Sequence, residues 1–194
     1  LIIGNKEENQ RVDIEALERE FPVWMSDIND LPSALDMIRR VGSISGTTPM
    51  AEHIAIGIEA GFAQLPPLGQ GRSVAYLIWR KPWMVAGPGT FIHDLLRRCG
   101  YTNAFAHRSE RYPEVTTAEM VAADPDLIFL SSEPYPFAAM HIAEMNLVLP
   151  GVPVQLVDGE MYSWYGSRLL QSPAYFNGLS VVLAATWLNW SALY

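Results

Sequence analysis

The segment 163–170, Ser-Trp-Tyr-Gly-Ser-Arg-Leu-Leu, places two large aromatic side chains beside a cation, Arg168. Aromatic rings can stack on a flat ligand, and a guanidinium can hold a carboxylate or phosphate through two hydrogen bonds. Gly166 would allow a tight turn between them. The segment follows a predicted strand at 154–157 and precedes a predicted helix. We therefore expect Trp164 to stack on a ligand and Arg168 to hold an acidic group at its rim.

The same residues also have an ordinary structural interpretation. A tryptophan in a loop often covers the hydrophobic core rather than a ligand. Arg168 could pair with a neighbouring acid such as Asp158 or Glu160. The sequence leaves both interpretations open for each side chain.

Further aromatic residues lie in segments that follow other predicted strands. In an open parallel sheet, the loops at the carboxyl ends of the strands meet along one edge, where ligands bind. The segments 80–89, 108–113, 131–137 and 158–168 should meet there, and the loops after Gly4 and Met25 should face them. They carry Trp83, Tyr112, Tyr135, Phe137, Tyr162, Trp164 and Tyr165. This edge is expected to bind a large, flat, partly apolar ligand.

A strand–helix–strand pattern occurs twice in the chain. The first copy has strands at 1–4 and 22–25 around apolar residues at helical spacing, 12–17. The second has strands at 126–130 and 153–157 around a helix at 139–147. Such crossovers require parallel strands. The fold class expected is α/β, with two Rossmann-like lobes.

The second copy has a prelude that the first lacks. A strand at 73–79 is followed by a helix at 89–99, which Gly100 closes, and by a short helix opened by Thr116 and Glu119 as a capping box. The first lobe is therefore expected to be incomplete. By analogy with the prelude, about 55 or more residues and a signal sequence are expected upstream. The incomplete lobe would expose a sheet edge, through which the chain could dimerise.

A helix is predicted between the lobes, because Ile54, Ile58 and Phe62 follow Thr48-Pro49 at helical spacing. About sixteen residues give roughly 24 Å, enough to join two lobes. The expected domains are a remnant of the N-terminal lobe at 1–47, the backbone helix and linker at 48–71, and the C-terminal α/β lobe at 72–194.

Composition argues against several functions. The net charge of −8 disfavours nucleic acid as a partner. The single cysteine, Cys99, excludes a disulfide within the chain. The longest apolar run, 179–187, is too short to span a bilayer.

An enzyme acting on a small phosphorylated or ester substrate is the competing class. Ser167 lacks the flanking glycines of a hydrolase nucleophile, and Gly87-Pro88-Gly89 lacks the Lys-Ser/Thr of a phosphate-binding loop. A direct metal-ion receptor would have to use His107 and Glu133. The histidines are otherwise scattered, at His53, His93, His107 and His141. These patterns favour a protein that is not an enzyme.

Three segments carry a resemblance to a known family: VAYLIWRKPWMVAGPGTFIHDLLRRCGYTNAF (74–105), RYPEVTTAEMVAADPDLIFLSSEPYPF (111–137) and VPVQLVDGEMYSWYGSRLL (152–170). The chain resembles the periplasmic binding proteins with a helical backbone (class III), the receptors of ABC importers for cobalamin, haem and iron–siderophore complexes. The resemblance covers residues 1–178, and the tail 180–194 shows none. It implies a metal-chelate ligand, no intrinsic cofactor, permease subunits as partners, and a location in the periplasm or on a lipid anchor.

The resemblance also implies roles for particular residues. Tyr112 stands where the cobalamin receptor has a pocket tryptophan, and Trp83, Trp164 and Arg168 lie in loops that line the family's cleft. With the predicted aromatic edge, the expected ligand-binding residues are Trp83, Tyr112, Tyr135, Trp164, Tyr165 and Arg168. The family docks on its permease through a surface glutamate in each lobe. Here that position is Ala118, so Glu119 beside it is the expected docking residue.

Overall fold

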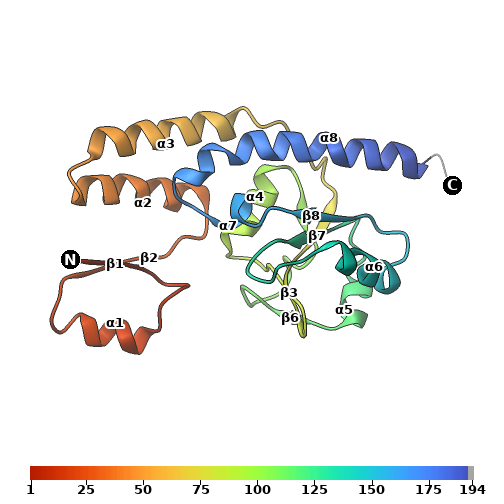
Figure 1. The fold of residues 1–194 in the computed structure, drawn as a ribbon, viewed down its shortest axis with the longest axis horizontal. Coiled ribbons are helices and arrows are strands. Elements are labelled where there is room, and N and C mark those ends of the chain that lie inside the picture. Colours follow the sequence, from red (N-terminus) through yellow and green to blue (C-terminus); the bar gives the residue numbers. More distant parts are fainter. Residues whose placement is uncertain (192–194) are drawn as a thin grey trace.

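A computed structural model describes the backbone of residues 1–191 and the side chains of residues 1–184. It contains a small unit built on a two-stranded sheet and a larger unit built on a six-stranded sheet. Two long helices connect them along one side of the molecule (Figure 1). The two-lobe α/β architecture expected from the sequence is confirmed, because no strand joins the two sheets.

The small unit consists of β1 (Ile2–Asn5), α1 (Arg11–Leu17) and β2 (Val23–Ser26). The two strands pair in parallel, with Ile2 opposite Val23 and Asn5 opposite Ser26. This is the predicted strand–helix–strand crossover, in which the helix connects two parallel strands. Only Ile14 of α1 is buried, so this unit has little core of its own.

The larger sheet has three parallel strands at its centre: β3 (Ser73–Trp79), β7 (Leu127–Ser131) and β8 (Val154–Val157). The strand order is β6-β4-β3-β7-β8, and the short β5 (Thr102–Asn103) also pairs with β3. Two short antiparallel strands, β4 (Trp83–Val85) and β6 (Glu114–Val115), extend the sheet beyond β3. We expected residues 80–89 to form a loop; the presence of β4 corrects this.

Side chains of the central strands alternate between two hydrophobic cores. Val74, Tyr76 and Ile78 belong to one core, whereas Ala75 and Leu77 belong to the other. This period of two follows from the pleat, which points successive side chains to opposite faces. Both faces are therefore covered, as parallel sheets require.

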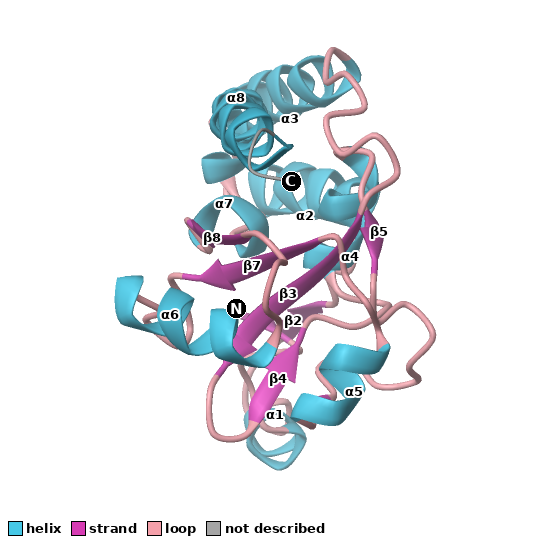
Figure 2. Cartoon of the chain, turned by 90° about the vertical axis from the view of Figure 1, so that its right-hand side faces the viewer, coloured by secondary structure: helices cyan, strands magenta, loops and turns pink. Residues whose placement is uncertain are grey.

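Helices cover the two faces unequally (Figure 2). One face carries only α5 (Thr117–Ala122) and α6 (Ala139–Val148). The other carries five helices and a 3-10 turn at Ser167–Leu170: α2 (Leu31–Ile44), α3 (Thr48–Ala63), α4 (Phe91–Arg98), α7 (Glu160–Ser163) and α8 (Ser172–Ser191). The predicted capping box of α5 is present, because Thr116 and Glu119 each accept a backbone hydrogen bond from the other.

Helices α2 and α3 form an antiparallel pair, and α8 runs beside α3 (Figure 1). The predicted inter-lobe helix corresponds to α3, whereas α2 was not predicted. Asp30 caps α2 by accepting from the backbone of Ser33. Gly42 permits close packing of the pair, since a Cβ there would lie 2.2 Å from the Cβ of Ala51. Over the described residues, no helix is long and apolar enough to cross a bilayer.

Candidate ligand-binding site

A cavity of about 770 Å³ lies between the small unit and the carboxyl end of the larger sheet. The sequence predicted this edge, because loops after several strands contribute to it. Its lining comes from both units: Asn5, Glu7, Glu8, Met37, Ile78, Trp79, Met84, Ile92, Tyr112, Glu133, Pro134, Ser163, Trp164, Tyr165 and Gly166. The volume falls in the range of small-molecule sites.

Trp164 presents its ring to the cavity rather than to the core. It directly follows α7, half of its surface is exposed, and its Nε1 donates to Glu133 Oε2 over 3.1 Å. The other carboxylate oxygen of Glu133 accepts from the hydroxyl of Ser163. The indole of Trp164 is therefore oriented by a hydrogen bond while much of its surface stays accessible.

Tyr112 and Tyr165 line the cavity and contact the small unit. The hydroxyl of Tyr112 donates to Glu7 Oε1 over 3.0 Å, and Asn5 Nδ2 donates to the Tyr165 hydroxyl over 2.5 Å. Burial raises the pKa of Tyr112, and the negative charge of Glu7 raises it further. Burial likewise raises the pKa of Tyr165, with Glu7 and Glu8 adding to the effect. Both tyrosines are neutral hydrogen-bonding groups at neutral pH.

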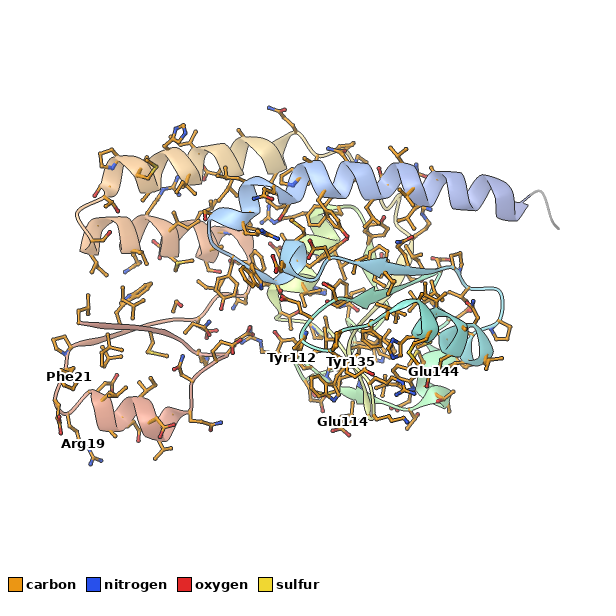
Figure 3. The ribbon with its side chains drawn as sticks, in the orientation of Figure 1. Arg19, Phe21, Tyr112, Glu114, Tyr135 and Glu144 are labelled. Atoms are coloured by element: carbon orange, nitrogen blue, oxygen red, sulfur yellow. The ribbon has the colours of Figure 1, made fainter. Side chains whose placement is uncertain are left out.

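Trp83 and Tyr135 do not line the cavity. Trp83 stacks on Phe137 with ring centroids 6.4 Å apart, and Tyr135 packs edge-on against the same ring at 4.8 Å. The Tyr135 hydroxyl lies 3.2 Å from Nε2 of His141. Because Trp83 belongs to β4 rather than a loop, the pleat directs it to the core beneath α5 and α6. Figure 3 shows Tyr112 and Tyr135 on the larger unit.

Arg168 is also absent from the cavity lining. Its Nη2 forms an ion pair with the carboxylate of Glu160, the alternative that the sequence left open. Its guanidinium carbon lies 5.9 Å from the ring centroid of Trp164. The structure thus places Arg168 as a neighbour of Trp164, and not as a grip on a ligand in the cavity. Gly166 has φ −96°, so no left-handed turn is needed between them.

Several lining residues were not predicted. Trp79 is the last residue of β3 and is 40% exposed, although the rest of that strand is almost entirely buried. An aromatic residue at the carboxyl end of a buried strand was a usable signal. Glu7 and Glu8 follow β1, where the same rule applies. No pattern in the sequence pointed to Met37 and Met84.

Expected sites for other chemistry are not assembled. Among the described residues, no three His, Cys, Asp or Glu side chains are grouped to hold a metal ion. Gly87 has a packing explanation, since a Cβ there would lie 2.4 Å from the carbonyl oxygen of Glu110. Ser167 begins the 3-10 turn. The predicted docking residue, Glu119, donates nothing outward: its carboxylate accepts from the Thr116 backbone and from Arg108 Nη1 over 2.9 Å.

The fold and the cavity between two units define a two-lobed periplasmic binding protein fold. The vitamin B12-binding protein of Pectobacterium carotovorum subsp. carotovorum (strain PC1) is 24% identical over 179 residues, covering 88% of this chain and 63% of that protein. The chain therefore spans less than two thirds of this curated relative. No family model matches it.

Solved structures show the same fold. The periplasmic haem-binding protein RhuT from Roseiflexus sp. RS-1, in its apo form, matches with a TM-score of 0.74 at 18% identity, over 92% of this chain and 73% of that one. An ABC-type Fe3+-hydroxamate transport system from Saccharomonospora viridis DSM 43017 matches with a TM-score of 0.67 at 17% identity, over 91% and 67%. The resemblance to class III binding proteins is confirmed, and these relatives are binding proteins rather than enzymes.

Proposed function

We propose that this chain is part of the solute-binding component of an ABC importer, which captures a cobalamin-, haem- or iron–siderophore-like chelate between its two units. The observation that carries the proposal is the cavity of about 770 Å³ with four aromatic side chains around it, Trp79, Tyr112, Trp164 and Tyr165. Aromatic rings of this kind suit a large, flat, partly apolar ligand. The names of its relatives support the same class of ligand.

The proposal includes the partners and the location of the protein. A captured chelate would pass to permease subunits in the membrane, so the chain would work outside the cytoplasm, in the periplasm or on a lipid anchor. Glu119 remains the proposed docking residue on the larger unit, with its side chain 42% exposed on α5. The chelated metal is cargo in this proposal, and the protein needs no cofactor of its own.

Tryptophan fluorescence tests the proposal directly. Cyanocobalamin, haemin and ferrioxamine B should be titrated separately, and at least one should quench the fluorescence saturably with micromolar or tighter affinity. In a Trp164→Phe variant the amplitude should fall, because Trp164 lines the cavity. The matched Trp83→Phe variant should retain it, because Trp83 packs in the core. No saturable binding of any of the three chelates would refute the proposed function.

A further inference from the structure

The ionisable groups that line the cavity are all acidic. Glu7, Glu8 and Glu133 line it together with two tyrosines, and no Lys, Arg or His is among its described lining residues. Carboxylates carry a negative charge at neutral pH. The feature concerns the same cavity as the proposed function, and it bears on which chelates that cavity accepts.

Neighbouring cations offset little of this charge. Arg111 pairs with Glu7 at 2.5 Å and neutralises one of the three carboxylates, so that three minus one leaves two. Arg168 is taken up by Glu160, which does not line the cavity. Lys6 is taken up by Asp27 in the small unit, with 2.5 Å between Nζ and Oδ2.

The two remaining carboxylates face no cation. Glu133 is held by neutral donors only, the Trp164 indole N–H and the Ser163 hydroxyl. Glu8 forms no ion pair with any residue that the structure describes. An anionic group placed in this cavity would therefore meet repulsion without a compensating partner.

The aromatic lining acts in the same direction. The faces of Trp79, Tyr112, Trp164 and Tyr165 carry the negative side of the ring quadrupole, which attracts cations and repels anions. Rings and carboxylates are independent features, and both favour a ligand surface that is neutral, positive or rich in N–H donors.

We infer that the cavity selects chelates that present amide, ammonium or other uncharged and cationic groups, and that it discriminates against chelates with free carboxylates. This inference rests on the proposed function and narrows its substrate class. It replaces the sequence-based expectation that Arg168 holds an acidic group of the ligand.

Matched ligand pairs that share a core test the inference. The pairs are cyanocobalamin and its monocarboxylic acid, haemin dimethyl ester and haemin, and ferrioxamine B and its N-succinyl derivative. In every pair that binds, the carboxylate-free member should bind at least tenfold more tightly, about 1.4 kcal/mol. Raising the salt concentration should improve binding of the carboxylate-bearing member, because screening weakens repulsion.

Two variants connect this preference to the named residues. Glu133→Gln and Glu8→Gln remove a charge with little change of shape, and each should reduce the ratio within a pair at least threefold while the melting temperature stays within a few degrees. Glu20→Gln is the matched control. Glu20 lies between Arg19 and Phe21, at the outer end of the small unit and far from Tyr112 (Figure 3). This variant should leave the ratio unchanged.

The outcomes separate the two proposals. If a core binds and its carboxylate-bearing member binds equally well or better, the charge preference is wrong and the solute-binding function stands. If Glu133→Gln and Glu8→Gln leave the ratio unchanged, these carboxylates are not its source, and the inference also fails. If none of the three cores binds in either form, the proposed function fails and the inference fails with it.

Discussion

Arg111 of the larger unit forms an ion pair with Glu7 of the small unit, with 2.5 Å between Nη2 and Oε1. Its Nη1 also lies 3.5 Å from Oδ1 of Asp27, and Tyr112 donates to the same carboxylate of Glu7. These contacts join segments more than eighty residues apart in the chain. They hold the loop after β1 against the wall of the cavity, so the two units are connected there as well as through α2 and α3.

Replacing Arg111 by alanine should loosen the small unit. The pair is partly exposed, at 31% and 22% of the two side chains, so we expect a loss of about 1 kcal/mol, roughly a fivefold change in an opening equilibrium. Backbone amides of β1 and β2 should exchange with deuterium about fivefold faster, while those of β3 and β7 keep their rates. Arg97→Ala is the matched control, because Arg97 is exposed on α4 and forms no ion pair in the described structure. Equal exchange in Arg111→Ala and the wild type would show that the ion pair does not hold the units together.

Replacing Trp164 by alanine should weaken ligand binding without unfolding the protein. The side chain is half exposed and lines the cavity, so its removal leaves no hole in the core. We expect at least a tenfold loss of affinity for whichever chelate binds, about 1.4 kcal/mol, and a melting temperature within a few degrees of the wild type. Phe176→Ala, at a fully buried ring, should show the converse: a large loss of stability. A stable Trp164→Ala protein with undiminished affinity would contradict this role.

A methyl group at Gly159 should disturb the loop that carries Glu133. A Cβ there would lie 2.4 Å from Ser131 Oγ and 2.5 Å from Glu133 Cγ. Gly159→Ala should therefore cost about 1–3 kcal/mol, measured by urea denaturation, and should alter ligand affinity. Gly166→Ala serves as the control, because a Cβ at Gly166 would meet no atom within 4 Å. Similar stability of the two variants would mean that the β7 and β8 loops can shift freely.

Glu119 should make stability depend on acid pH. Hydrogen bonds from the Thr116 backbone and hydroxyl and from Arg108 hold the pKa of Glu119 at about 2, below its ordinary value of 4.5. A carboxylate with a lowered pKa stabilises the fold fully above its unfolded pKa, and this contribution is lost as the pH falls from about 4.5 to about 2. The stability difference between the wild type and Glu119→Gln should therefore be largest near pH 6 and shrink through that window.

Urea midpoints between pH 6 and pH 2.5 would measure this difference. Glu114→Gln is a suitable control, because the Glu114 side chain is exposed and forms no ion pair in the described part of the chain. Its difference from the wild type should not shrink in the same window. A constant difference for Glu119→Gln would show that the cap and the Arg108 pair contribute nothing to folding.

The local patterns of the sequence determined most of the larger unit. Seven residues of β3 were predicted to the residue, and the crossover from β7 through α6 to β8 was predicted with its parallel pairing. The reason is physical: buried parallel strands are short apolar runs, and turn and capping residues mark their ends. The edge on which the cavity lies followed from the same rule for carboxyl ends of strands.

Tertiary structure decided which side chains reach the cavity. Trp83 turned away because three residues of an expected loop form β4, whose pleat sets the direction of each side chain. Arg168 took a partner that the sequence could only offer as an alternative, Glu160. Tyr112 meets Glu7 although 105 residues separate them. Composition and periodicity specify which strands and helices form, but a contact between distant loops depends on how the two units pack, and no local pattern records that packing.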